Sequence, residues 1–207
     1  MKKIILLIVV LISTNGVAQS KYEQGMAKAF ELWGQQKTSE ACQLFERITK
    51  AEPEEWLPPY YVATLEILGS FGIKDEATLN SKLKKAQEFL DIAKSLSPNN
   101  PEIIINQALL NTAYIAFDGQ KYGMTLSGKN AALYSEALKI APENPRVVLG
   151  KAEWDMGSAR FFNQSIEPYC KDVEKSIELF DKEELPKFYP MYGKERAQQV
   201  LKQCKKS

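Results

Sequence analysis

The chain has 207 residues, with 27 Lys and Arg against 26 Asp and Glu, which gives a formal net charge of +1. This near-neutral balance, without a basic cluster, argues against a nucleic-acid partner, because proteins that bind nucleic acids neutralise phosphates with Lys and Arg. The chain contains no histidine, which excludes Ser-His-Asp and Cys-His catalysis and every His-based metal site. Since no phosphate-binding or dinucleotide-binding glycine motif is present either, we expect a protein that is not an enzyme and has no metal or cofactor.

The first 18 residues have the layout of a secretory signal peptide. The basic start "MKK" precedes nine apolar residues, 4–12, and a polar stretch follows. The apolar run is too short to span a bilayer, which needs about 20 residues. Cleavage after Ala18 would leave residues 19–207, enough for a single domain. We therefore expect an exported protein, in the periplasm or else secreted, without a stable membrane span after cleavage.

A repeated helical pattern fills the remainder of the chain. Prolines recur at intervals of 45, 44 and 44 residues, at Pro53, Pro98, Pro142 and Pro186. Internal periods of 20–50 residues indicate stacked repeat units. The turns "LSPNNPEI" and "IAPENPRV" end one helix at a proline and begin the next with Asn-Pro, which suits an N-cap and the first helical position. The pattern predicts four helical hairpins, over about 22–53, 56–98, 101–142 and 145–185.

These units resemble the tetratricopeptide repeat (TPR), a helical hairpin of 34 residues. Residues 22–55 match the repeat at full length, with Ala29, Ala41, Phe45, Ile48 and Pro53 at its landmark positions. The later units keep the landmarks but carry extra residues between their helices, near 70–80, 117–128 and 160–170. A HEAT-like repeat, whose period is longer, is the alternative.

The TPR resemblance implies an all-α fold: a right-handed α-solenoid of about four hairpins, in which residues 193–205 form a C-terminal capping helix. In that family the first helix of each hairpin lines a concave groove, which holds an extended peptide or a partner's helix. The positions that match the family's groove are Met26, Phe30, Trp33, Leu57, Tyr60, Thr64, Glu102, Ile105, Leu109, Arg146, Leu149 and Glu153. Packing between neighbouring helices is the alternative role for these side chains.

We therefore expect an exported, non-enzymatic scaffold for protein or peptide interaction, whose partner the sequence does not identify. The alternative is a helical repeat protein that binds a small ligand or a glycan through aromatics near the insertions, such as Tyr60 and Phe162. Within "EEWLPPYY", Trp56 and Tyr61 are predicted to pack in the core, and Tyr60 is left open. The segment "PKFYPMYG" at 186–193 is predicted to fold onto the last hairpin.

The three cysteines receive different predictions. Cys42 lies on an apolar helical pattern, so we expect a buried thiol. Cys170 and Cys204 could pair in an exported chain, since such compartments are oxidising. The closed loop would then stabilise the fold by roughly 3–4 kcal/mol in the chain-entropy model. Sequence alone leaves the pairing open, because it does not place the two sulfur atoms near each other.

Overall fold

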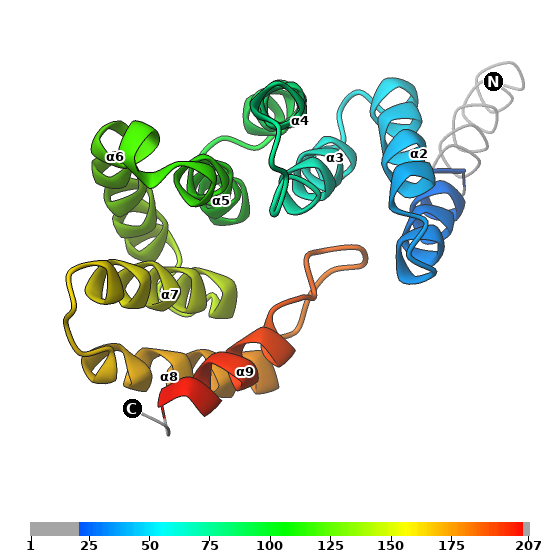
Figure 1. The fold of residues 1–207 in the computed structure, drawn as a ribbon. Helices are drawn as coiled ribbons and strands as arrows, with labels where there is room; N and C mark the ends of the chain where they lie inside the picture. Colours follow the sequence, from blue (N-terminus) through cyan, green and yellow to red (C-terminus); the bar gives the residue numbers. More distant parts are fainter. Residues whose placement is uncertain (1–20, 205–207) are drawn as a thin grey trace, which may run out of the picture.

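A computed structural model describes residues 21–204, in which all the regular secondary structure is helical (Figure 1). The predicted signal peptide, residues 1–18, lies outside this range. The first helical residues are 21–34, and the helices that follow are α2 (Thr38–Ala51), α3 (Leu57–Leu68), α4 (Glu76–Leu96), α5 (Pro101–Phe117), α6 (Gly119–Ile140), α7 (Pro145–Phe161), α8 (Glu167–Lys182) and α9 (Lys194–Cys204). None of the helices in the described range is both long and apolar enough to cross a membrane.

The helices stack into a curved solenoid (Figure 1). Consecutive helices pair as α3 with α4, α5 with α6 and α7 with α8, and α9 packs on α8. Helices α3, α5 and α7 also contact one another in succession along the inside of the curve, while α4 and α6 lie outside them. This arrangement confirms the all-α solenoid that the repeated pattern predicts.

Each of the two repeated turns supplies the N-cap residue of the helix that follows, as its Asn-Pro sequence predicts. The side chain of Asn100 accepts a hydrogen bond from the backbone N–H of Glu102 at 2.9 Å, and α5 begins at Pro101. Asn144 accepts a bond of the same length from the N–H of Arg146, and α7 begins at Pro145. A cap of this kind satisfies an N–H group that the first helical turn leaves unpaired.

Much of the extra sequence between hairpin helices is itself helical. Helix α6 begins at Gly119, directly after the capping residue Asp118, so the insertion near 117–128 lengthens the third hairpin. The other two insertions include the short connections at residues 69–75 and 162–166. The hydroxyl of Tyr122, near the start of α6, donates a hydrogen bond of 2.8 Å to Glu76 at the start of α4. This hydrogen bond links the first turns of the two long helices α4 and α6.

A disulfide joins Cys170 of α8 to Cys204 of α9, with their Cα atoms 5.9 Å apart. The pairing that the sequence left open is present in the structure, and it fixes the C-terminal helix to the last hairpin. Cys42 is a free, buried thiol. Burial, together with the carboxylate of Glu66, raises the pKa of Cys42 to about 12.

Cys42 should therefore resist alkylation in the native protein. The thiolate is the reactive form, and at neutral pH both the raised pKa and the burial of Cys42 suppress it. Intact mass after iodoacetamide treatment should show no adduct on the native chain and one on the denatured, unreduced chain. Reduction before denaturing alkylation should give three adducts. Rapid labelling of the native chain would contradict this assignment.

Candidate binding site on the concave face

The segment that joins α8 to α9, residues 183–193, crosses the inside of the curve and reaches the first hairpins (Figure 1). We call this segment the strap. The hydroxyl of Tyr61 donates a hydrogen bond of 2.6 Å to the backbone carbonyl of Phe188. The Phe188 ring stacks on that of Phe30, with ring centroids 5.9 Å apart and planes within 6°. The prediction that residues 186–193 fold onto the last hairpin is therefore wrong, because their aromatic side chains pack with those of the first two hairpins.

Two further tyrosines of the strap contact the second hairpin. The ring of Tyr189 meets that of Trp56 edge-on, with centroids 5.4 Å apart. The hydroxyl of Tyr192 forms a short hydrogen bond with the hydroxyl of Tyr60. These rings extend a group that we call the aromatic cluster, which consists of Tyr22, Phe30, Trp33, Phe45, Trp56, Tyr60 and Tyr61 from the helices and Phe188, Tyr189 and Tyr192 from the strap.

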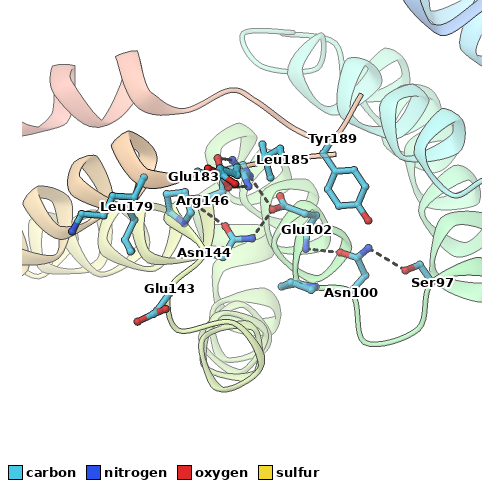
Figure 2. Close-up of a pocket in the computed structure, with 14 residues that line it drawn as sticks. Ser97, Asn100, Glu102, Glu143, Asn144, Arg146, Leu179, Glu183, Leu185 and Tyr189 are labelled. Carbon is cyan, nitrogen blue, oxygen red and sulfur yellow. Dashed lines mark hydrogen bonds and ion pairs between the residues drawn. The ribbon is translucent and has the colours of Figure 1, made fainter. Parts of the chain in front are cut away.

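A buried ionic group holds the start of the strap. The Nε of Arg146 lies 2.8 Å from Glu102 Oε1, and its Nη1 donates a hydrogen bond of 2.8 Å to Glu183 Oε2 (Figure 2). Arg146 is 4% exposed and Glu102 3%. Both residues follow the Asn-Pro of a repeated turn, so the repeat itself places the pair at the start of two neighbouring inner helices.

The environment of Glu102 makes its charge depend on Arg146. Burial raises the pKa of the Glu102 carboxyl, and the Arg146 guanidinium opposes that rise. The side-chain amide of Asn144 donates a hydrogen bond of 2.6 Å to Glu102 Oε1. Oε2 of the same carboxylate has no hydrogen-bond partner in the described part of the chain.

A cavity of about 640 Å³ lies beside this ionic group (Figure 2). Its walls come from the two repeated turns, the end of α8 and the strap, including Leu185 and Tyr189. The volume falls within the range of about 300–1,000 Å³ that small-molecule sites occupy. Tyr189 lines this cavity and also belongs to the aromatic cluster, so the cavity and the cluster adjoin at the strap.

The twelve groove positions that the TPR resemblance implied do not form an open wall in this structure. None is exposed, and eight are buried: Met26, Leu57, Tyr60, Thr64, Glu102, Ile105, Arg146 and Leu149. The other four, Phe30, Trp33, Leu109 and Glu153, are half-buried. The cause is twofold, since some of these side chains fill the space between neighbouring helices and others lie against the strap.

The structure brings only a subset of these positions to one place. Phe30, Tyr60 and Arg146 contact the strap, and Glu102 reaches it through Arg146. Met26 and Leu57 belong instead to the core of the first hairpins. Ile105 belongs to the core between the third and fourth hairpins, and Leu149 to the C-terminal core. Phe162, the other aromatic considered from sequence, is 67% exposed and contacts Phe161 rather than the aromatic cluster.

Sequence reasoning missed the strap residues as part of the site. Glu183 and Tyr192 carry no motif, and their partners lie far away along the chain. The available signal was composition, because "PKFYPMYG" holds three aromatic rings between two prolines and a glycine. Such a segment cannot continue a helix and needs an apolar surface to cover its rings.

One group of potential metal ligands lies outside this site. Oxygen or sulfur atoms of Cys42, Glu46 and Glu66 lie within 4.8 Å of one another. The ammonium of Lys85 lies 2.6 Å from Glu46 and 2.8 Å from Glu66, and that of Lys82 lies 2.9 Å from Glu66, so two positive charges balance the two carboxylates. We therefore interpret the group as an ion-pair network between the first and second hairpins.

Comparison with known proteins supports a helical repeat-like fold. No family model matches the chain, and no curated protein matches it. Among solved structures, the HusA haemophore from Porphyromonas gingivalis aligns with a TM-score of 0.78 and 24% sequence identity, over 89% of this chain and 92% of that one. This likeness shows a shared fold. A thermophilic TPR protein from Thermus thermophilus aligns with a TM-score of 0.45 and 13% identity, over 90% of this chain and 100% of that one.

Proposed function

We propose that this protein is an exported, non-enzymatic binding protein of TPR-related architecture, and that its concave face holds a flat, largely apolar small molecule. The observation that carries the proposal is the aromatic cluster, which lines the inside of the solenoid next to a cavity of ligand size. Aromatic faces bind planar ligands by offset stacking and by burial of apolar area.

Three further observations support this proposal. The HusA structure, which aligns with a TM-score of 0.78, is described as a haemophore, which makes a porphyrin the natural first ligand to try. The Cys170–Cys204 disulfide suits an oxidising compartment and hence export. Residues with the layout of a signal peptide, 1–18, agree with that location.

The absence of histidine from the chain shapes the expected binding mode. A haem iron would need a ligand from Tyr, Cys or Met, or none from the protein. We therefore expect affinity to come from the porphyrin ring, so that metal-free protoporphyrin IX binds about as tightly as haemin. Titration of each, followed by absorbance, measures this directly.

A matched pair of variants localises the site. Trp56→Leu, which removes a half-buried ring of the aromatic cluster, should weaken binding about five- to tenfold through lost stacking and contact area. Phe162→Ala removes an exposed ring outside the aromatic cluster and should leave the affinity unchanged. If both variants bind like wild type, or wild type binds no porphyrin, the proposed ligand class is wrong.

A protein or peptide ligand is the second candidate. The observation that favours it is the strap itself, a non-helical stretch of chain that lies on the concave face. Crosslinking in native envelope extracts, followed by mass spectrometry, would then yield one recurrent partner. That result, combined with no porphyrin binding, would favour the peptide over the small molecule.

A further inference from the structure

The strap is anchored where it leaves α8 and where it enters α9. The disulfide between these two helices lies at their far ends, because Cys170 is in the first turn of α8 and Cys204 is the last residue of α9. Gly193 closes the second end with a φ of +118°, and a Cβ at this position would lie 2.7 Å from the ring of Phe180. Glycine is therefore required where the strap turns into α9.

The middle of the strap is held by side-chain contacts rather than by regular structure. The hydroxyl of Tyr61 bonds to the carbonyl of Phe188, and the hydroxyl of Tyr60 bonds to that of Tyr192. Its outer side chains stay in water, with Met191 77% exposed. Contacts of this kind are typical of a bound peptide, and because no helix includes these residues, the segment can leave without breaking helical hydrogen bonds.

The strap also carries backbone strain. Phe188 has a φ of +66°, in the left-handed region that a bulky residue rarely adopts. Such a conformation persists only where surrounding contacts hold it, and here those contacts are the Phe30 ring and the Tyr61 hydroxyl. Release of the strap would relieve this strain, which lowers the free-energy cost of displacement.

The chemistry of the strap indicates what could replace it. It places one carboxylate, Glu183, on the buried Arg146 and three aromatic rings against rings of the first two hairpins. A free molecule with the same two features, a flat aromatic system and a carboxylate, would satisfy the same partners. Arg146 suits this exchange, because its planar guanidinium binds carboxylates through two parallel hydrogen bonds.

We infer that the strap is a displaceable internal occupant of the concave face, and that an aromatic carboxylate displaces it by taking the place of Glu183 on Arg146. This inference rests on the proposed function and adds to it a subsite for the carboxylate and a segment that must open. The apparent affinity of such a site falls with the fraction of molecules whose strap is open. Weakening the strap should therefore strengthen ligand binding.

The test compares two full-length variants and two probes. Glu183→Gln removes the charge that binds Arg146 and leaves Arg146 paired with Glu102 alone, so the buried group changes from a net charge of −1 to neutral. Glu174→Gln makes the same chemical change at an exposed position of α8, outside the strap and the cavity lining. The probes are protoporphyrin IX, which carries two carboxylates, and its dimethyl ester, which carries none.

Glu183→Gln should bind protoporphyrin IX about tenfold more tightly than wild type, the change that corresponds to one charge-assisted hydrogen bond. Glu174→Gln should match wild type, and the free acid should bind wild type more tightly than the ester. Hydrogen exchange should show that peptides from the strap lose protection when the probe binds, while α8 and α9 keep theirs.

The outcomes separate this inference from the proposed function. If acid and ester bind equally and the strap stays protected, porphyrin binding stands and displacement of Glu183 is wrong. If Glu183→Gln and Glu174→Gln bind alike, the strap does not compete with the ligand. If neither probe binds wild type or Glu183→Gln, both the function and the inference fail.

Discussion

Replacing Arg146 with alanine should lower the free energy of unfolding by about 3–5 kcal/mol, the range for removing one partner of a buried ion pair. Arg146 is 4% exposed and bonds to both Glu102 and Glu183. Without it, the Glu102 carboxylate would stay buried and unpaired, or would have to take up a proton. Urea unfolding followed by circular dichroism measures the loss.

Two comparison variants make that result interpretable. Arg196→Ala removes an arginine that is 56% exposed and pairs with Glu153, so it should change stability by less than about 1 kcal/mol. The double variant Arg146→Met with Glu102→Leu replaces the charged pair by apolar side chains, and should recover much of the loss. An Arg146→Ala protein as stable as Arg196→Ala would show that the buried pair contributes little.

The acid response of the Arg146→Ala variant adds a second readout. With Arg146 gone, the rise that burial gives the pKa of Glu102 is opposed by the Asn144 hydrogen bond but no longer by a positive charge. A group whose pKa is higher in the folded state binds a proton on folding, so its destabilising effect is smallest at low pH and grows as pH rises through the folded pKa. The stability gap between wild type and the variant should therefore narrow as the pH falls. A gap that is constant with pH would place the loss in packing rather than charge.

Removing the Cys170–Cys204 disulfide, through serine at both positions, should lower the free energy of unfolding by about 3–4 kcal/mol. The two cysteines are 34 residues apart, and closing a loop of that length removes much of the freedom of the unfolded chain. Parallel urea titrations of the oxidised protein and the double variant measure this difference.

Dithiothreitol supplies the control for the disulfide. It should destabilise wild type by the same amount and should leave the double serine variant unchanged, because the remaining thiol, Cys42, is already free. A shift below about 1 kcal/mol in both experiments would mean that α9 stays packed on α8 without the covalent bond, so that the loop-entropy account is wrong.

The parts of the fold that local physics determines could be predicted from sequence. The Asn-Pro turns specify N-caps at Asn100 and Asn144, because the cap and the helix it starts lie within three residues of each other. The spacing of apolar residues likewise specified where helices such as α2 and α4 present a buried face.

The candidate site could not be predicted in the same way. Tyr61 and Phe188 are 127 residues apart, and Arg146 and Glu183 are 37 apart. No periodicity connects such pairs, since the strap lies outside the repeat. The resemblance to TPR proteins placed a groove where this chain has its strap, because a repeat motif describes each unit and its neighbour but not a segment that folds back across several units.

The strap also changes how the molecule should fold. In an ordinary solenoid each repeat contacts only its neighbours, so stability is close to a sum of local terms and the ends can unravel separately. Here, contacts such as Tyr61–Phe188 join the second hairpin to the segment before α9 and raise the contact order of the chain. The aromatic face of the first hairpins stays uncovered until residue 188 has been synthesised. The first hairpins therefore complete their folding only when the strap, near the C-terminal end of the described chain, packs onto them.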